Sequence, residues 1–455
     1  MRFPDFILRL KNRFDEAGYE LYAVGGCVRD RLLGRPVVEY DLTTNALPEQ
    51  TRKLLSLEKP DSVYMLGEKF GTIGSIWGKT HVEITTYRGE QYEPGSRKPE
   101  VQFSSTLEED LSRRDFTVNA IAEDISAPRL IDPFGGSADL HRKLIRAVGQ
   151  PADRFRDDPL RLLRAVRFAS TLDFEIEDQT AHSVRECAGQ LEHISRERIR
   201  DEMSRMLTGP APDAALAQLT ELRLMQHIVP ELLELRNIST GGGRHKDIFT
   251  HTLQVVQRVR DDLVTRWAAV LHDIAKPRTV GRREDGKLHF DGHEQVGATM
   301  ARRILSDLRY DRPTVDAVAN VVALHTHANS YSAEWTDGAV RRLVRDAGPQ
   351  LRALLHLSRA DITSYHRHKV QAAARRVDEL QERIRQLEQQ ASIEALRPPL
   401  DGNDLMRIFD RPPGPWLKPL LTHLLDQVIE GNLAPDDRGA AETIVREMYE
   451  KMEQE

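Results

Sequence analysis

The chain has 455 residues, of which 40% are hydrophobic and 30% are charged, and its formal net charge is −6. This length predicts about three domains, and because no apolar run approaches the roughly 18 residues that cross a bilayer, we expect no membrane partner. The N-terminus has no apolar secretion segment and the two cysteines cannot form a disulfide framework or a thiolate zinc site, so a cytoplasmic protein is expected.

Residues 1–141 alternate strand and helix signals, which predicts an α+β domain. Residues 21–24 are apolar and end at Gly25-Gly26, as a short buried strand would. Residues 82–87 alternate in polarity and are rich in β-branched side chains, which predicts a strand. Residues 72–77 are expected to pair with it as a hairpin.

From about residue 142 the pattern becomes helical almost throughout, and strand signals vanish. Residues 237–244 contain three consecutive glycines and are predicted to be a linker between two helical blocks. The sequence therefore divides into an α+β domain over 1–141, a helical domain over 142–236, a second helical domain over 245–395 and a small tail domain over 396–455.

Residues 370–391 carry apolar side chains at alternating steps of three and four residues, which is a heptad seam. We interpret this seam as one long helix that packs on its own domain. The alternative is a coiled coil between two copies of the chain. The oligomeric state, monomer or homodimer, is left open by the sequence.

The first candidate site combines a glycine turn with a pair of carboxylates. Gly26 precedes Arg29 on a predicted helix, and both bare backbone N–H groups and a guanidinium fork suit phosphate oxygens. Glu39 and Asp41 are two residues apart on a predicted strand, so their side chains share one face. Such carboxylates repel each other unless a divalent cation lies between them, and Mg²⁺ prefers oxygen ligands. Glu83 is either a third acid near this pair or an exposed strand residue.

Five segments in chain order resemble the class II tRNA nucleotidyltransferase/poly(A) polymerase family. They are residues 24–30, Val-Gly-Gly-Cys-Val-Arg-Asp, followed by the acidic pair, and then residues 107–120, 130–136, 154–168 and 196–202. The resemblance implies a polymerase-β-like head with a mixed sheet and helices, followed by all-α neck, HD and tail domains. It also implies that Glu39 and Asp41 are catalytic and hold Mg²⁺. The implied activity is the addition of nucleotides from CTP and ATP to the 3′ end of tRNA without a template.

One residue departs from the family pattern, because Glu39 stands where the first metal ligand is typically aspartate. The charge is kept, but the carboxylate lies one methylene further from the backbone, which shifts a bound metal by about 1 Å. We expect a site that is retained but slower. The alternative is a head without catalytic activity.

Residues 154–168 are predicted to form one helix on which Asp158, Arg161, Arg164 and Arg167 recur every three residues. A solvated face with i,i+3 ion pairs is the structural alternative. Cytosine and adenine each place an amino group beside a ring-nitrogen acceptor, so the carboxylate of Asp158 and the guanidinium of Arg161 suit both bases. Uracil and guanine present the reverse pattern, and a buried unpaired polar group costs about 1–3 kcal/mol.

The resemblance further implies which side chains contact the sugar and the phosphates. The complete predicted nucleotide-binding set is Gly26, Arg29, Arg114, Asp115, Asn119, Asp158, Arg161, Arg164 and Arg167. The loop over 88–97 has the full length that accompanies addition of both C and A in this family, although a mobile hairpin tip is the alternative. CCA addition is therefore the expected activity, with CC-only, A-only and poly(A) addition as alternatives.

The second candidate site lies in the block over 245–395. It contains, in chain order, His251, the pair His272-Asp273, and Asp361. Imidazoles and carboxylates on helices suit a divalent transition metal that activates water for phosphoester hydrolysis. The ordered set resembles the HD phosphohydrolase superfamily. The resemblance implies that His251, His272, Asp273 and Asp361 ligate the metal, and that His293 and His325 extend the site to a second ion. By analogy the substrate is a 2′,3′-cyclic or terminal phosphate of RNA.

The second site has one alternative interpretation, and the whole chain has another. The block is either an active hydrolase or a degenerate domain that serves as a scaffold for RNA. For the whole chain, the alternative is a protein of another class, namely an HD phosphohydrolase whose degenerate head only binds RNA. Glu39 is the only residue that supports this alternative.

The expected macromolecular partner is tRNA, held mainly through its phosphates by basic side chains. The candidates are Arg196, Arg198, Arg200, Lys246, Arg302 and Arg303. Each of them is alternatively a solvated surface charge. Residues 400–406 resemble the C-terminal helical domain of the same family, and RNA contact by the domain over 396–455 is an expectation.

Overall fold

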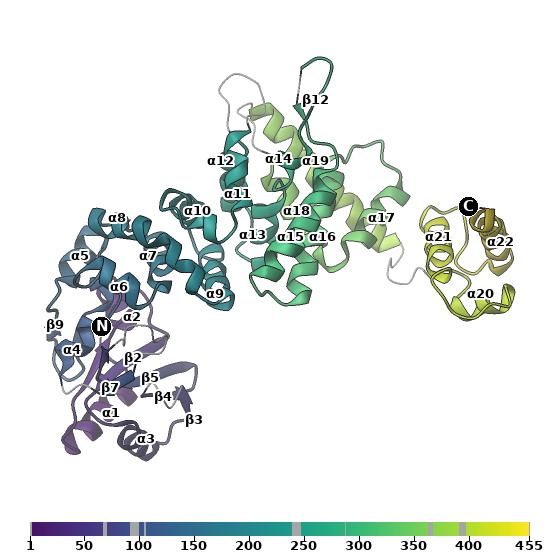
Figure 1. The fold of residues 1–455 in the computed structure, drawn as a ribbon. Coiled ribbons are helices and arrows are strands. Elements are labelled where there is room, and N and C mark those ends of the chain that lie inside the picture. The colour runs from purple at the N-terminus through teal and green to yellow at the C-terminus, as the bar shows by residue number, and fades with distance from the viewer. Residues whose placement is uncertain are drawn as a thin grey trace. The chain divides into compact units, whose positions relative to one another are not determined.

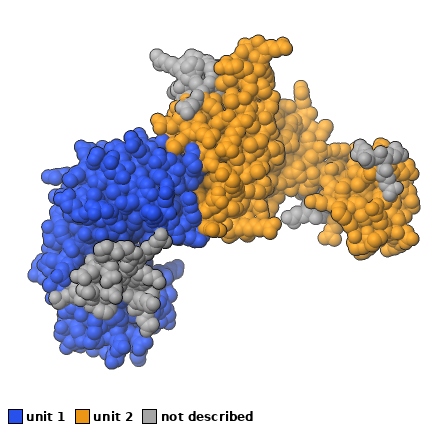
Figure 2. Space-filling view, in the orientation of Figure 1, with its two compact units in different colours: residues 1–230 blue, residues 231–455 orange. Residues whose placement is uncertain are grey.

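The computed structural model describes residues 2–66, 71–91, 100–103, 106–238, 247–286, 288–362, 367–390 and 397–454. The chain forms two compact units, residues 1–230 and residues 231–455, which Figure 2 colours separately. Most of the predicted linker over 237–244 and the RNA-contact candidate Lys246 lie outside the described residues. The finer division into four domains remains a prediction.

The first unit is built on a seven-stranded sheet of order β3-β4-β5-β2-β1-β8-β9 (Figure 1). Its strands are β1 (Leu21–Val24), β2 (Glu39–Thr44), β3 (Ser62–Leu66), β4 (Thr72–Trp77), β5 (Thr80–Thr86), β8 (Ala122–Asp124) and β9 (Leu130–Ile131). β2 is parallel to β5 and the other neighbours are antiparallel, so the expected mixed sheet is confirmed. The predicted strand over 21–24 and the predicted hairpin of residues 72–77 are also confirmed.

Short helices connect and cover these strands. They are α1 (Asp5–Glu16), α2 (Gly26–Leu32), α3 (Pro48–Leu57), α4 (Leu107–Ser112) and α5 (Gly136–Arg142). In α1, the apolar residues Ile7, Leu10 and Phe14 recur at helical spacing, are fully buried, and pack the helix on β1 and α3. A separate hairpin of β6 (Arg88–Gln91) and β7 (Glu100–Phe103) follows β5, and residues 92–97 of the predicted long loop lie outside the described residues.

The helical part of the first unit contains α6 (Pro151–Asp157), α7 (Leu160–Leu172), α8 (Asp178–Cys187), α9 (Arg196–Leu207) and α10 (Pro212–Glu221). The prediction of one continuous helix over 154–168 is wrong, because the chain leaves helical geometry at Asp158, with φ −143° and ψ 101°. Proline 159 explains the break, since its ring disfavours helical geometry in the preceding residue. Asp158 therefore lies between two helices, while Arg161, Arg164 and Arg167 share α7.

The prediction that strands are absent after about residue 142 is wrong, because four short strands follow that residue in the described part of the chain. Two parallel two-residue strands, β10 (Leu144–Ile145) and β11 (Glu175–Ile176), tie the start of the helical part to its middle. The antiparallel strands β12 (Gly281–Arg282) and β13 (Leu288–His289) form a hairpin in the second unit. Segments of two residues give too short an alternation to be detected from sequence.

The second unit is almost entirely helical. Its helices are α11 (Glu231–Glu234), α12 (Ile248–Arg258), α13 (Leu263–Leu271), α14 (Lys276–Thr279), α15 (His293–Asp307), α16 (Arg312–Asn329), α17 (Asp337–Ala347), α18 (Leu351–Ala360), α19 (Arg367–Gln390), α20 (Gly402–Ile408), α21 (Leu417–Ile429) and α22 (Arg438–Gln454). α13 is central, since residues 265–271 are all buried and it packs on α12, α16 and α18. Among the described helices, none combines the length and apolar composition that a membrane span requires.

The heptad seam forms the buried face of α19. Val377, Leu380, Ile384 and Leu387 are at most 5% exposed, and the helix packs on α17 and α18 of the same chain. The interpretation of one long helix packed on its own domain is therefore confirmed, and these seam positions are used within the chain. The tail helices α20, α21 and α22 share a separate small core that includes Leu405, Leu420 and Val445.

Candidate functional site

The glycine turn after β1 lies directly against an acidic and a basic side chain. Gly25 has φ +71°, and a Cβ atom there would lie 3.1 Å from Nη1 of Arg114 and 3.3 Å from Oδ2 of Asp41. A side chain at this position would meet both a strained backbone conformation and this crowding. Glycine therefore lets the backbone before α2 approach Asp41 and Arg114.

The predicted acids gather on one face of two parallel strands. Asp41 on β2 is in register with Glu83 on β5, and Glu39 precedes Asp41 by two residues on the same face. Burial raises the pKa of Asp41, and Glu39 raises it further, against the opposing effect of the Arg114 guanidinium. Burial also raises the pKa of Glu83, as do the charges of Asp41 and Glu39. Asp41 and Glu83 are part-buried carboxylates whose pKa values are raised by burial and by neighbouring acids, and such a pair fits a hard divalent cation. The placement of Glu83 favours its interpretation as a third acid.

All of the predicted nucleotide-binding residues line one cavity of about 490 Å³ in the first unit. They are Gly26, Arg29, Arg114, Asp115, Asn119, Asp158, Arg161, Arg164 and Arg167, and Asp41 lies on the same wall. The segments that carry them are far apart in sequence, and the fold brings them together. The abundance of guanidinium groups suits a polyanionic ligand such as a nucleoside triphosphate.

Buried hydrogen bonds orient the arginines of this cavity. Nη1 of Arg29 donates to Oδ1 of Asn119 over 2.9 Å, and Nε of Arg164 donates to Oδ2 of Asp115 over 2.7 Å. Burial alone would raise the pKa of Asp115, but the Arg164 charge and a hydrogen bond from Asn119 lower it to about 2. Asp115 is therefore ionised at neutral pH, and it accepts hydrogen bonds from Arg164 and Asn119.

The sequence analysis missed one orienting residue, Asp110, and one further residue of the cavity wall, Arg88. Asp110, which is fully buried, accepts hydrogen bonds from Arg113 over 2.7 Å and from Arg114 over 3.0 Å. Its spacing of four residues from Arg114, which lies just after the end of α4, was the available signal. Arg88 also lines the cavity, and nothing in the local sequence pattern pointed to it.

The two predicted base-reading residues are held by partners within the protein. Oδ1 of Asp158 accepts from the backbone N–H of Leu160 over 3.1 Å, and Oδ2 accepts from Arg198 over 2.9 Å. Arg161 donates to the carbonyl oxygens of Arg113 and Arg154 over 2.8 and 3.2 Å. These contacts fix both side chains at the cavity wall, and they reveal Arg198 as a partner of Asp158.

The basic residues predicted to contact RNA also have partners within their own unit. Arg196 donates to the carbonyl oxygen of His227, and Arg200 pairs with Asp201. In the second unit, Arg302 pairs with Asp316 and Arg303 with Glu231. Their contact with RNA remains a prediction.

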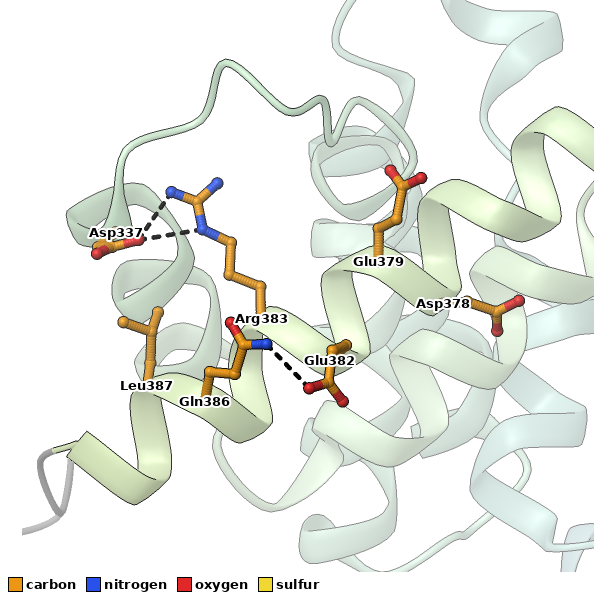
Figure 3. A pocket seen from close by; sticks show the side chains of 7 residues that line it. All are labelled: Asp337, Asp378, Glu379, Glu382, Arg383, Gln386 and Leu387. Atoms are coloured by element: carbon orange, nitrogen blue, oxygen red, sulfur yellow. Dashed lines mark hydrogen bonds and ion pairs between the residues drawn. The ribbon is translucent and has the colours of Figure 1, made fainter.

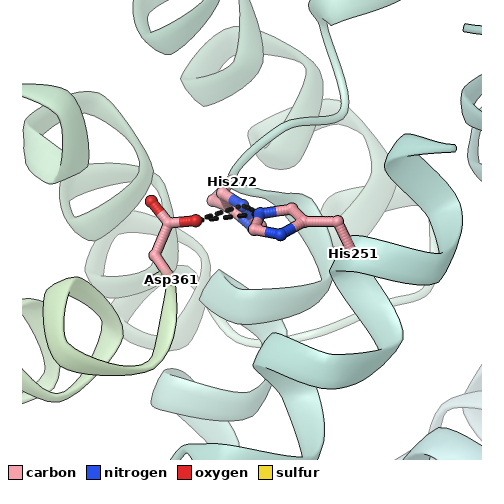
Figure 4. A group of neighbouring side chains, drawn as sticks. All are labelled: His251, His272 and Asp361. Carbon is pink, nitrogen blue, oxygen red and sulfur yellow. Dashed lines mark hydrogen bonds and ion pairs between the residues drawn. The ribbon is translucent and has the colours of Figure 1, made fainter. Parts of the chain in front are cut away.

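The second candidate site gathers six ligand side chains from five segments of the second unit. Two groups, each with ligand atoms within 4.8 Å of one another, are His251 with His272 and Asp361, and Asp273 with His293 and His325. Figure 4 shows the carboxylate of Asp361 facing the imidazoles of His251 and His272. Their Nε2 atoms lie 2.9 and 3.5 Å from Oδ1 of Asp361.

Asp273 lies between the two groups. Its Oδ2 is 3.3 Å from Nε2 of His272, and its Oδ1 is 3.6 Å from Nε2 of His293 and 3.9 Å from Nε2 of His325. One carboxylate thus presents an oxygen to each group. The six side chains would suit two divalent ions, and they include all four predicted HD ligands.

Backbone contacts set which nitrogen of each imidazole faces the site. Nδ1 of His272, His293 and His325 lies 2.9, 2.7 and 2.7 Å from the carbonyl oxygens of Ala269, Phe290 and Val322. Donation from Nδ1 turns Nε2 of each ring towards the site, which is the usual arrangement of a metal-binding histidine. Burial and the neighbouring His272 lower the pKa of His325 to about 4, so this imidazole is neutral at pH 7.

The acids of this site attract positive charge strongly. Although burial disfavours the imidazolium, Asp273 and Asp361 raise the pKa of His272 to about 10. Lys276 donates to Oδ2 of Asp273 over 2.6 Å, and Asn329 donates to Oδ2 of Asp361 over 2.7 Å. The proton on His272 and the Lys276 ammonium thus place positive charge beside the two carboxylates. Divalent ions would place more positive charge there.

The second unit has a cavity of about 520 Å³ between the start of α17 and the middle of α19 (Figure 3). Arg383 donates to Asp337 over 2.7 Å, and Gln386 donates to Glu382 over 2.9 Å. Asp378 and Glu379 add further acidic charge to the lining. This surface repels phosphate, so we assign no nucleotide or RNA site to it.

Three segments of the chain match known families. Residues 21–146 match the Poly A polymerase head domain, residues 173–235 match the probable RNA and SrmB-binding site of polymerase A, and residues 248–383 match the HD domain. The matched segments contain most of both candidate sites. The base-reading segment around Asp158 lies between the first two.

Similar proteins span nearly the whole chain. The A-adding tRNA nucleotidyltransferase of Deinococcus radiodurans is 34% identical over 422 residues, which cover 89% of this chain and 90% of the relative. The CCA-adding enzyme of Geobacillus sp. is 31% identical over 418 residues, which cover 91% of this chain and 90% of the relative. The structure of the Bacillus stearothermophilus CCA-adding enzyme in complex with CTP is similar with a TM-score of 0.69 at 27% identity, covering 99% of this chain and 98% of that chain.

Proposed function

Because the chain belongs to the tRNA nucleotidyltransferase/poly(A) polymerase family, we propose that it adds CCA to the 3′ ends of tRNA from CTP and ATP. The observation that carries this proposal is the cavity of about 490 Å³, where basic side chains, the base-reading pair and Asp41 meet. Addition requires no nucleic-acid template, since protein side chains take the place of a template base. The products are an RNA longer by one nucleotide and pyrophosphate.

The head requires divalent metal for this reaction, and we propose Mg²⁺ held by Glu39 and Asp41, with Glu83 beside them. Such ions lower the pKa of the RNA 3′-hydroxyl and neutralise the charge that develops on pyrophosphate. The guanidinium groups of Arg29 and Arg114 supply further positive charge in the same cavity. Because these groups are fixed before the substrate arrives, little reorganisation is needed during the reaction.

We propose that Asp158 and Arg161 select the base. The carboxylate accepts a hydrogen bond from the amino group of cytosine or adenine, and the guanidinium donates to the adjacent ring nitrogen. The contact between Arg198 and Asp158 supports this assignment, because it holds the carboxylate in place at the cavity that both residues line. Uracil and guanine would leave a carboxylate facing an oxygen, which is unfavourable.

We predict that Asp158→Ala weakens the choice of base more than it weakens catalysis itself. Preference for CTP over UTP should fall by about 10- to 100-fold, from the roughly 1–3 kcal/mol cost of an unpaired buried group. Single-turnover extension of a tRNA transcript lacking CCA, with each nucleoside triphosphate in turn, measures this preference.

The matched control is Asp153→Ala. Asp153 is an exposed carboxylate of the neighbouring helix α6 that pairs with Arg156. Its removal should leave both rate and preference unchanged. An unchanged preference in Asp158→Ala would contradict the base-reading assignment.

We propose a second activity for the HD site, the hydrolysis of a phosphoester at an RNA end. The ligand set of four histidines and two aspartates supports it, since this set suits a pair of divalent transition-metal ions. When bound, these ions supply a water of lowered pKa as nucleophile. A 2′,3′-cyclic or terminal phosphate is the proposed substrate, and a scaffold role is the alternative.

Addition of A alone is the main alternative for the first activity. The Deinococcus radiodurans relative carries that name, and Asp158 with Arg161 suits adenine as well as cytosine. The loop predicted to favour addition of both nucleotides lies largely outside the described residues. The base-reading pair therefore limits the choice to C and A but does not set their order.

A further inference from the structure

Phe168 lies at the wall of the nucleotide cavity and its ring is held in a fixed orientation. The side chain, near the end of α7, is only 6% exposed. Its ring packs edge-on against Phe116, with centroids 5.8 Å apart and an interplanar angle of 80°. Because Phe116 is itself fully buried, this packing holds the Phe168 ring in place.

Three guanidinium groups lie over this one ring. The guanidinium carbon of Arg167 is 4.1 Å from the ring centroid, and those of Arg29 and Arg164 are each 5.2 Å from it. Arg164 and Arg167 come from α7, whereas Arg29 comes from α2. All three arginines belong to the set that lines the nucleotide cavity.

Three guanidinium groups this close together repel each other, so neighbouring groups must hold them in place. Each arginine has a carboxylate partner, namely Asp30 for Arg29, Asp115 for Arg164 and Glu202 for Arg167. Those partners fix one edge of each guanidinium. The ring supplies the remaining constraint, because the negative face of an aromatic ring attracts cations within about 6 Å.

We propose that Phe168 is a positioning residue for the nucleoside triphosphate, whose ring fixes three phosphate-binding arginines before the nucleotide arrives. The inference rests on the proposed nucleotidyl transfer and adds a determinant of triphosphate affinity. An aliphatic side chain would fill much of the same space but would offer no negative face. The freed guanidinium groups would then lose conformational entropy at the binding step instead of during folding.

The test compares Phe168→Leu with Phe168→Tyr, which keeps the aromatic face. We expect Phe168→Leu to raise the KM for CTP and for ATP by about tenfold, with a smaller change in kcat, from the loss of cation–π contacts. The Kd of CTP with magnesium, measured by calorimetry without RNA, should rise by the same factor. Phe168→Tyr should keep both values within about twofold of wild type. Base preference should not change in either variant, because Asp158 and Arg161 are untouched.

Phe155→Leu serves as the matched control for loss of a buried ring. Phe155 is fully buried in α6, and its ring is not among those that line the cavity. It should lower the melting temperature while leaving the KM of the folded protein unchanged. If Phe168→Leu does not fold, Phe168→Met is compared in the same way.

Failure of the positioning role of Phe168 can be distinguished from failure of the proposed nucleotidyl transfer. If wild type adds nucleotides but Phe168→Leu or Phe168→Met retains wild-type KM and Kd, the positioning role is wrong. An equal increase in KM for the tyrosine variant would also overturn it, because the aromatic face would then be irrelevant. If wild type adds no nucleotide and binds no CTP, the proposed function itself fails, and this inference with it.

Discussion

Asp41→Ala should abolish nucleotide addition, with a loss of at least about a thousandfold in rate. Asp41 is the one predicted metal ligand that lines the nucleotide cavity, and removing it deletes charge where metal and triphosphate meet. Burial raises the pKa of this carboxyl, so its ionised form costs the folded state stability above that pKa. The variant should therefore melt no lower than wild type at pH 7. Extension of a tRNA transcript, together with thermal unfolding, checks both expectations.

Two companion measurements sharpen this result. Glu39→Asp restores the ligand that the family typically has at this position, and we expect its rate to equal or exceed that of wild type. A large loss would mean that the site is adapted to the longer side chain. Phosphoester hydrolysis at the HD site should persist in Asp41→Ala, and nucleotide addition that survives the substitution would contradict the metal assignment.

Asp273→Asn should remove metal from both positions of the HD site and abolish hydrolysis there. One carboxylate presents Oδ1 to His293 and His325, and Oδ2 to His272, so its charge serves both positions. Asparagine keeps the shape but lacks the charge that binds the ions. Manganese content per chain, measured by mass spectrometry after dialysis, should fall from about two ions to none. Hydrolysis of a 2′,3′-cyclic phosphate at an RNA end should be lost in parallel.

His325→Ala provides the matched comparison. His325 belongs to only one of the two groups, so its removal should cost one ion and leave the other. Loss of both ions from His325→Ala, or of only one from Asp273→Asn, would contradict the assignment of Asp273 to both positions. Nucleotide addition should be unaffected in both variants. Wild type that binds metal but hydrolyses no phosphoester would make the HD block a scaffold.

Much of both sites could be predicted from the sequence because the chemistry depends on local pattern. The turn at Gly25-Gly26, the strand alternation of Glu39 and Asp41, and the pair His272-Asp273 are each encoded within a few residues. These three features needed no knowledge of distant contacts. The role of Glu83 was left open, because its place opposite Asp41 depends on the pairing and register of β2 with β5, which the local pattern does not give.

The features that escaped prediction depend on tertiary packing. Arg198 contacts Asp158 across forty residues, and Arg29 reaches the ring of Phe168 from a different helix. The helix break at Asp158 is a different case, because Pro159 signalled it locally while the three-residue charge repeat favoured a continuous helix. Where a local rule and a periodic pattern disagreed, the local steric rule determined the structure.

Stepwise extension of three tRNA transcripts, ending before CCA, after the first C and after CC, tests the proposed function most directly. Each transcript is incubated with magnesium and labelled CTP, ATP, both together, UTP or GTP, and the products are resolved to single nucleotides. We expect C and A to be added in order, addition to stop at CCA, and UTP and GTP not to be used. Addition of A only to the transcript ending in CC, a long A tail, or no incorporation by folded protein would contradict it.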